Sequence, residues 1–171
     1  SLKFSPDGSR IAVGALDGSV RVWDTETGSP TGPALHHQGF VVGLAFSPDG
    51  QTLATGSMCE YVQLWDVATG RVRLTLQEET RQGGGAWCRS VAFSPDGKSL
   101  AAASQTGLVR LWDLATSRLR ASLRGHTAAV KCVAFSSDGN TVATASSDRT
   151  VRLWDTATGQ EKITLKGFNG T

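Results

Sequence analysis

Short apolar segments, separated by polar turn sequences, follow one another along the whole chain. The first three cover residues 2–4, 10–15 and 19–24. Pro6 in the turn Ser5-Pro6-Asp7-Gly8 presets its backbone angle, and Gly8 accepts the positive φ that closes a hairpin. This pattern predicts four short strands in a repeating unit, the fourth of them near residues 34–36. No stretch shows sustained apolar spacing of 3.6 residues, so no helix longer than one turn is expected.

The third segment recurs in four near-copies, each of which closes with a Trp-Asp pair. They are Ser19-Val20-Arg21-Val22-Trp23-Asp24, Tyr61-Val62-Gln63-Leu64-Trp65-Asp66, Leu108-Val109-Arg110-Leu111-Trp112-Asp113 and Thr150-Val151-Arg152-Leu153-Trp154-Asp155. The tryptophans are 42, 47 and 42 residues apart, and the phenylalanines before the first turns, at positions 4, 46, 93 and 135, have the same spacings. The five additional residues of the third copy therefore lie before Phe93, which predicts a longer loop at residues 77–86.

Four Trp-Asp units in phase at a period near forty residues resemble the WD-repeat β-propeller family, and the resemblance covers essentially the whole chain. It implies an all-β fold in which each repeat forms a blade of four antiparallel strands. The expected blades lie at about 1–36, 40–76, 87–123 and 128–165 of a single propeller segment, 1–171. The last strand of the fourth blade is expected at 162–165.

Blades of this kind bury their apolar faces against one another, so the first and fourth blades are each expected to have an open face. Propellers of the WD-repeat family most often have seven blades, and four blades predict an incomplete ring. Three arrangements would cover the open faces: further blades of a longer parent chain, a second copy that completes an eight-bladed ring, or closure of the four blades on themselves. The abrupt start at Ser1, inside a strand, favours the first, in which the chain is a fragment.

The resemblance also implies a hydrogen-bond network in each blade, which joins a His before the first strand, a hydroxyl on the second, an Asp in the next turn and the Trp of the third. The fourth blade has all members: His126, Thr144, Asp148 and Trp154. The second blade has part of the set: His37, Thr55 and Trp65, with Cys59 in place of the Asp. A structural role is expected for these residues.

WD-repeat proteins commonly bind partner proteins or peptides at the ends of the blades where the second-to-third-strand turns and the interblade loops gather. Positions carried over from the family give the candidate partner-binding residues Leu16, Phe40, Val42, Met58, Trp87, Arg89 and Lys131. Trp and Arg are enriched at binding hot spots, which makes Trp87 the main candidate. The alternative is that Trp87 folds over the loop Gly83-Gly84-Gly85. The expected ligand is a segment with apolar and acidic side chains.

Composition and charge exclude several other classes of protein. The net charge is +2, from 17 basic and 15 acidic residues, which is too balanced to indicate nucleic-acid binding. No apolar run is long enough to cross a membrane. The cysteines Cys59, Cys88 and Cys132 form no C-x-x-C pair, which indicates free thiols in a reducing, cytoplasmic compartment.

The sequence therefore predicts a non-catalytic interaction scaffold, without a cofactor or a metal ion. One alternative is a regulatory or sensor module of a signalling enzyme whose catalytic domain lies outside this chain; a weak nucleic-acid binder is a less favoured one. His126, Ser146 and Asp148 could be read as a nucleophilic triad, but no Gly-x-Ser-x-Gly elbow accompanies them.

Overall fold

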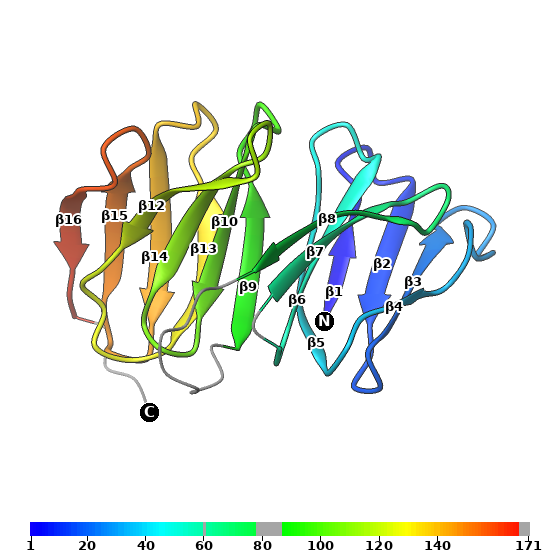
Figure 1. Ribbon diagram of the computed structural model, residues 1–171, viewed down its shortest axis with the longest axis horizontal. Coiled ribbons are helices and arrows are strands. Elements are labelled where there is room, and N and C mark those ends of the chain that lie inside the picture. The colour runs from blue at the N-terminus through cyan, green and yellow to red at the C-terminus, as the bar shows by residue number, and fades with distance from the viewer. Residues whose placement is uncertain (60, 78–86, 168–171) are drawn as a thin grey trace. The chain divides into compact units, whose positions relative to one another are not determined.

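Four antiparallel sheets, each of four strands, make up the computed structural model, which describes residues 1–59, 61–77 and 87–167 (Figure 1). The described residues form no helix. The strands of each sheet are neighbours in chain order, so each sheet is a simple up-and-down meander. This topology confirms the predicted all-β class and its four-stranded blades. The expectation of an incomplete ring stays a prediction.

The strand bounds follow the turn signals of the sequence closely. Blade 1 contains β1 (Leu2–Phe4), β2 (Arg10–Gly14), β3 (Ser19–Asp24) and β4 (Leu35–His36). Blade 2 contains β5 (Val41–Phe46), β6 (Thr52–Ser57), β7 (Tyr61–Asp66) and β8 (Val72–Gln77). Blade 3 contains β9 (Cys88–Phe93), β10 (Ser99–Ser104), β11 (Val109–Asp113) and β12 (Arg118–Leu123). Blade 4 contains β13 (Val130–Phe135), β14 (Thr141–Ser146), β15 (Val151–Asp155) and β16 (Glu161–Leu165).

The chain divides into two compact units, unit 1 at Ser1–Cys88 and unit 2 at Arg89–Thr171. Unit 1 contains blades 1 and 2, and unit 2 contains blades 3 and 4, except that Cys88, the first residue of β9, falls in unit 1. The predicted longer loop at residues 77–86 lies almost entirely outside the described residues, as does the loop Gly83-Gly84-Gly85.

Each unit has a core between the facing sides of its two sheets. We call the side of a blade toward the following blade its forward face and the opposite side its rear face. In unit 1 the forward face of blade 1 packs on the rear face of blade 2, and all the residues of this core are at most 7% exposed: Ala12, Val20, Val22, Leu35, Val41, Leu44, Phe46, Leu53, Trp65 and Val67. Alternation along a strand puts every second residue on the same face, which explains why β3 contributes Val20 and Val22.

Unit 2 repeats this packing. The forward face of blade 3 packs on the rear face of blade 4, and the core consists of Ala101, Ala103, Val109, Leu111, Leu123, Val130, Val133, Val142 and Trp154. Neither blade could bury its apolar surface alone, so the pair is the smallest unit with a core.

The aspartates of the two recurring turns hold those turns closed. In each first turn a Ser hydroxyl donates to the Asp two residues later, as Ser5 does to Asp7 over 2.6 Å. In each Trp-Asp pair the Asp accepts the backbone N–H and the hydroxyl of a Thr three residues later, as Asp66 does from Thr69 over 2.8 and 2.9 Å. These bonds from Thr69, with Arg73, lower the pKa of Asp66 to about 2.

Candidate functional site

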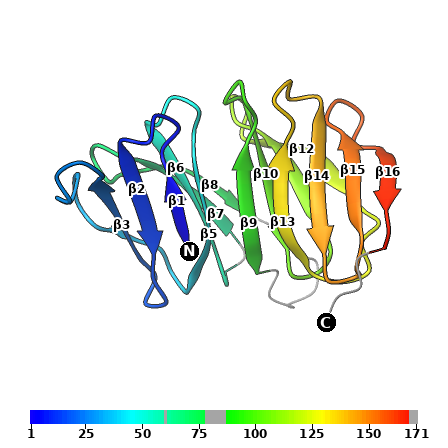
Figure 2. The same ribbon diagram turned by 180° about the vertical axis from the view of Figure 1, so that it is seen from behind.

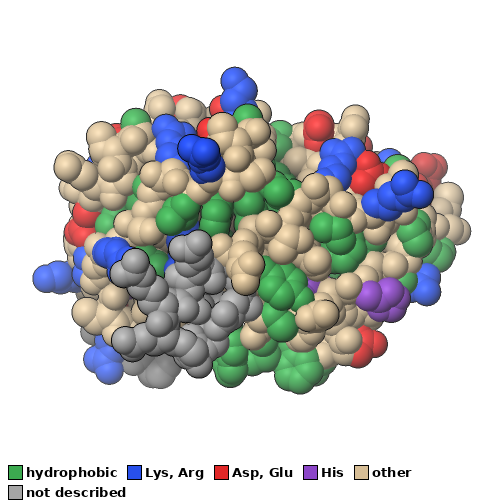
Figure 3. All heavy atoms as spheres, in the orientation of Figure 1, with side chains coloured by type: hydrophobic (Ala, Val, Ile, Leu, Met, Phe, Trp, Pro, Cys, Tyr) green, Lys and Arg blue, Asp and Glu red, His purple; other side chains and the backbone are tan. Residues whose placement is uncertain are grey.

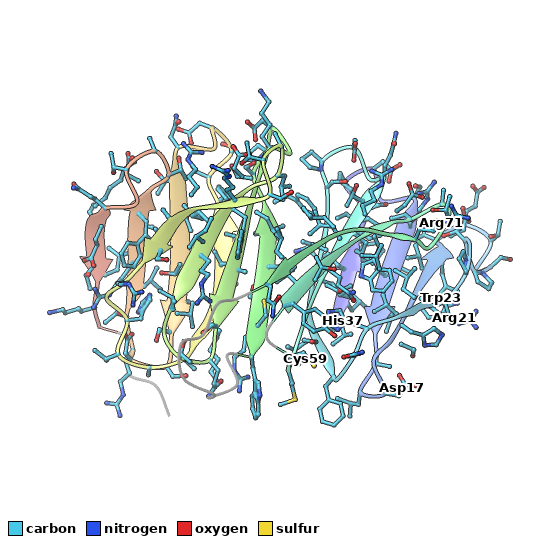
Figure 4. The ribbon with its side chains drawn as sticks, viewed as in Figure 1. Asp17, Arg21, Trp23, His37, Cys59 and Arg71 are labelled. Atoms are coloured by element: carbon cyan, nitrogen blue, oxygen red, sulfur yellow. The ribbon has the colours of Figure 1, made fainter. Side chains whose placement is uncertain are left out.

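The second-to-third-strand turns and the loops that lead into each blade's first strand meet at one end of the blades, which we call the loop end. In unit 1 three backbone hydrogen bonds connect them: His37 N–H to Gly18 O at 2.9 Å, Val41 N–H to Ala15 O at 3.3 Å and Met58 N–H to Phe40 O at 3.1 Å. Figure 4 shows Asp17 and Cys59 at this end of unit 1 and Arg71 at the opposite end. Backbone hydrogen bonds therefore hold the turns at the loop end of unit 1 to one another.

Gly18 allows these turns to approach each other. Its φ is +86°, and a Cβ added there would lie 2.2 Å from the carbonyl oxygen of His37. A side chain at this position would combine an unfavourable backbone conformation with a clash against main chain. The contact between the turn after β2 and the loop after β4 therefore depends on glycine.

In blade 4 the structure brings His126, Thr144, Asp148 and Trp154 together. The His126 Nδ1–H donates to Asp148 Oδ2 over 2.7 Å, because a carboxylate can only accept. The other ring nitrogen, Nε2, lies 2.8 Å from Thr144 Oγ1, which also accepts the Trp154 indole N–H at 2.8 Å. A continuous chain of hydrogen bonds thus joins the loop end to the middle of the blade.

Sequence reasoning missed two members of this network. The Thr150 hydroxyl donates to Asp148 Oδ1 over 2.6 Å, and the Thr127 backbone N–H donates to Asp148 Oδ2 over 3.1 Å. The side chain of Asp148 is only 6% exposed. Burial alone would raise its pKa, but the hydrogen bonds from Thr150, His126 and the backbone outweigh burial and hold the pKa of Asp148 far below its usual range. The carboxylate is therefore ionised, and both of its oxygens accept hydrogen bonds.

In blade 2 the structure keeps only part of the network. The Trp65 indole N–H donates to Thr55 Oγ1 over 2.9 Å, but His37 does not join this pair. Its Nδ1–H donates to Gln38 O over 2.8 Å, and its Nε2 has no hydrogen-bond partner among the described residues. The physical reason is the residue at position 59, since a Cys in place of the Asp offers no carboxylate to His37.

Tyr61, which sequence reasoning also missed, replaces the lost contact. Its ring stacks on the imidazole of His37 with ring centroids 5.0 Å apart, and its hydroxyl donates to Gln38 Oε1 over 3.0 Å. Desolvation lowers the pKa of His37, against a smaller opposing effect of the hydrogen bond to Gln38. His37 is therefore a neutral, buried side chain at the base of the loop end.

The candidate partner-binding residues of unit 1 differ in exposure. Leu16 and Phe40 are 71% and 47% exposed, Trp87 is 36% exposed, and Met58 is half-buried. Val42 is half-buried at a β-bulge of β5. Hydrophobic side chains are visible along the lower edge of unit 1 in Figure 3, which is the loop end.

The position of Trp87 follows from its neighbour in the chain. Cys88 lies against Gly56, where an added Cβ would be 2.6 Å from its sulfur, and Gly56 is two residues before Met58. Trp87 therefore precedes a residue that packs next to the turn containing Met58. The alternative contact with the glycine loop lies outside the described residues.

In unit 2 the candidate residues are basic. Arg89 donates to Gln105 Oε1, which links the first strand of blade 3 to the turn after β10. Lys131 is exposed at a β-bulge of β13, the position equivalent to Val42. Arg149, which sequence reasoning missed, is exposed in the turn after β14 with φ +67°. Its place directly after the turn Asp could have identified it.

A comparison with protein-family models matches the WD domain, G-beta repeat family at residues 1–24, 30–66, 77–113 and 117–155, well over half of the chain. The chain belongs to this family. A comparison with curated proteins finds no match. WD domains generally act as scaffolds for protein–protein interaction and are typically non-catalytic. The four matched stretches each end at the Asp of a Trp-Asp pair.

The triad reading of this WD domain does not agree with the contacts of Ser146. The Ser146 hydroxyl donates to Ala128 O over 2.9 Å and accepts the backbone N–H of Asp148 at 3.1 Å. His126 bonds to Thr144 instead. Ser146 thus fixes the turn, and the imidazole has no contact through which to activate it.

Within residues 1–59, 61–77 and 87–167, no three His, Cys, Asp or Glu side chains gather as a metal site would require. The same residues contain no helix long and apolar enough to cross a membrane. The three cysteines form no disulfide; Cys88 is buried, Cys59 half-buried and Cys132 exposed.

Proposed function

We propose that this WD domain is a non-catalytic interaction module whose loop end binds a segment of a partner protein. The observation that carries the proposal is the exposure of Leu16 and Phe40, at 71% and 47%, on adjoining turns of unit 1. Large apolar side chains that gather in exposed loops, above a rigid sheet, are typical of interaction surfaces.

The backbone that carries Leu16 and Phe40 is held in place by hydrogen bonds, which favours binding. The backbone bond from Val41 N–H to Ala15 O holds the turns of Leu16 and Phe40 together, and the Cys59 thiol donates to Gln38 O over 3.0 Å. A surface that is already ordered loses little conformational entropy when a partner binds. We expect Phe40 to insert into the partner and Leu16 to enlarge the apolar contact.

The loop end of unit 2 supports an acidic partner. Lys131 and Arg149 are exposed cations there, and Arg89 is half-buried against Gln105. The neighbouring Asp148 is already saturated by hydrogen bonds, so it does not neutralise Lys131 or Arg149 by a direct ion pair. Carboxylates of a partner would contribute selectivity and association rate at this position.

Selection from a displayed random-peptide library on the purified chain tests the proposal. We expect two kinds of selected peptide, apolar ones that bind the loop end of unit 1 and acidic ones that bind the loop end of unit 2. For an apolar peptide Phe40→Ala should cost about 2 kcal/mol of binding, a rise in Kd of about 30-fold measured by fluorescence anisotropy. Trp87→Ala should weaken binding of the apolar peptide as well. For an acidic peptide Lys131→Glu should reduce the salt dependence of the association rate.

Val72→Ala is the matched control, because Val72 is 44% exposed on β8, away from the loop end. It should leave the Kd unchanged. Apolar peptides whose affinity is insensitive to both Phe40→Ala and Trp87→Ala, in variants with wild-type circular dichroism, would count against the proposed surface.

We also propose that the protein works in a reducing, cytoplasmic compartment. The absence of a disulfide among Cys59, Cys88 and Cys132 supports this, because disulfides persist mainly in oxidising compartments.

A further inference from the structure

The exposed large apolar residues of the described chain fall into three groups. Leu16, Phe40 and Trp87 belong to the loop end, and Val72 and Leu119 lie on the outermost strands of blades 2 and 3. The other four lie on the rear face of blade 1 or the forward face of blade 4: Leu2, Phe4, Ile163 and Leu165. These two faces, the rear of blade 1 and the forward face of blade 4, carry the same kinds of apolar side chains as the two sides of the blade-to-blade packing inside units 1 and 2.

The forward face of blade 4 is apolar across all four strands. The register of the sheet places these side chains on one face: Cys132, Ala134, Ala143, Ala145, Val151, Leu153, Ile163 and Leu165. All eight are half-buried or exposed, with Ile163 at 51% and Leu165 at 43%. In Figure 2 this sheet lies in front of β12, and no described strand of unit 2 is drawn over it.

The same face of blade 3 shows what this surface is built to contact. Leu111 and Leu123 occupy the positions of Leu153 and Leu165 one repeat earlier, and they are only 2% and 0% exposed because the rear face of blade 4 covers them. The forward face of blade 4 therefore has the composition of a blade-to-blade seam without the second blade.

The rear face of blade 1 is the complementary half of such a seam. Its register groups Leu2, Phe4, Ile11, Val13, Arg21 and Trp23. Leu2 and Phe4 are 59% and 55% exposed, whereas Leu44 and Phe46, the same positions in blade 2, are each 7% exposed under blade 1. Figure 4 shows Trp23 and Arg21 on this blade.

The glycines of the turns after the Trp-Asp pairs mark the seam independently. An added Cβ at Gly70 would lie 2.4 Å from Pro33 Cγ of the preceding blade, and one at Gly159 would lie 2.9 Å from Ala121 Cβ. In both cases the turn of one blade packs on the blade before it, at Pro33 and Leu35 beside or on β4 and at Ala121 on β12. Gly28, the same position in blade 1, has nothing within 4 Å. An outermost strand such as β16 would have room to pack there.

We infer that the forward face of blade 4 binds the rear face of blade 1 of a second copy, so that two chains associate head to tail. Both halves of one seam are present on this chain, and the seams inside units 1 and 2 show how they fit. A head-to-tail contact closes if two copies form it twice. Two chains would then supply eight blades, the upper end of the range of about four to eight for propellers.

Sedimentation equilibrium of the 171-residue chain tests this inference. The expected mass is twice the 18.0 kDa of one chain. Ile163→Glu and Phe4→Glu should each reduce the mass toward 18.0 kDa, because a carboxylate would be desolvated in the seam. Val72→Glu, at an exposed aliphatic outside both faces, should keep the wild-type mass. Circular dichroism would check that each variant is folded.

A mixture of the two variants identifies the direction of the contact. The chain with Ile163→Glu keeps an intact rear face of blade 1, and the chain with Phe4→Glu keeps an intact forward face of blade 4. Mixing them should therefore restore one seam and raise the mass above 18.0 kDa. No gain in mass on mixing would overturn the head-to-tail contact.

The mass of the wild-type chain in solution distinguishes a second copy from the other proteins or segments that could cover these faces. A wild-type chain of 18.0 kDa at every concentration would overturn the inference, because the chain would then either close on itself or await a different protein. Assemblies that grow with concentration beyond two chains would overturn the closed pair and indicate an open filament.

Discussion

At the scale of single residues, equivalent positions of the repeat have diverged in chemistry. Asp148 in blade 4 and Cys59 in blade 2 follow the same strand, yet only Asp148 binds a histidine. The carboxylate fixes the tautomer of His126, while His37 turns its Nδ1–H to its own backbone neighbour and stacks on Tyr61. One network is polar and complete, and the other relies on ring packing.

The network of blade 4 should contribute measurably to stability. Asp148→Ala leaves His126 buried without its acceptor, so we expect a loss of about 1–3 kcal/mol in the free energy of unfolding, measured by urea denaturation. Asp17→Ala is the control, since Asp17 lies in the equivalent turn but, among the described residues, its side chain bonds only to Ser19; it should cost about 0.5 kcal/mol or less. Equal effects of the two substitutions would contradict the role of His126.

The buried His37 predicts a dependence of stability on pH. Its folded-state pKa lies below the ordinary value of about 6.5, so the unfolded chain takes up the proton first as the pH falls. The contribution is fully present above about pH 6.5 and decreases as the pH falls from there toward the folded pKa.

Urea denaturation between about pH 7.5 and 5.5 measures this effect. His37→Gln should flatten the decline in stability with falling pH, and His36→Gln, at the exposed neighbour, should leave it as in the wild type. A wild-type decline in the His37→Gln variant would assign the effect to other groups.

Sequence reasoning reached some of these residues and missed others for a definite reason. His126, Thr144, Asp148 and Trp154 could be named because the family motif fixes their spacing. Tyr61 could not, because a stacked ring is a contact across the loop end that no spacing encodes.

At the scale of elements, the turns determine where each strand stops. Pro6 and Gly8 marked the first hairpin from the sequence, and β2 and β3 begin at Arg10 and Ser19 as predicted. The β-bulges at Val42 and Lys131 were not predicted, because a bulge adds one residue to a strand without a distinctive residue type. Those bulges redirect two of the candidate partner-binding side chains.

The two kinds of turn glycine should respond differently to alanine. Gly8→Ala should cost about 1–2 kcal/mol, because its φ of +73° disfavours a Cβ but nothing lies within 4 Å. Gly18→Ala should cost about 3 kcal/mol or more, because the same backbone strain is added to a clash with the His37 carbonyl. Thermal and urea denaturation of both variants would measure the difference; similar losses would argue against the tight contact at Gly18.

At the scale of the whole molecule, the repeat explains why the sequence was informative about blades and uninformative about their number. Every blade has an apolar forward face and an apolar rear face, so the pattern inside a blade is the same whether a neighbour exists or not. Leu123 and Leu165 are equivalent in sequence, and only the structure shows that the first is 0% and the second 43% exposed. The exposed fraction of these side chains cannot be read from the repeat. It distinguishes a blade face that packs on a neighbouring blade from one that does not.

The serine at position 137 has a consequence for how such a pair of chains would come apart. In the first hairpin turns, Pro6 lies 3.9 Å from a Cβ placed on Gly50, and Pro95 lies 3.5 Å from one placed on Gly139. Blade 4 has Ser137 at the position of this proline, so the proposed seam between copies lacks the proline contact. Dilution or mild heating would therefore dissociate the two chains while the blades of each chain stay folded. Subunits would then exchange between assemblies.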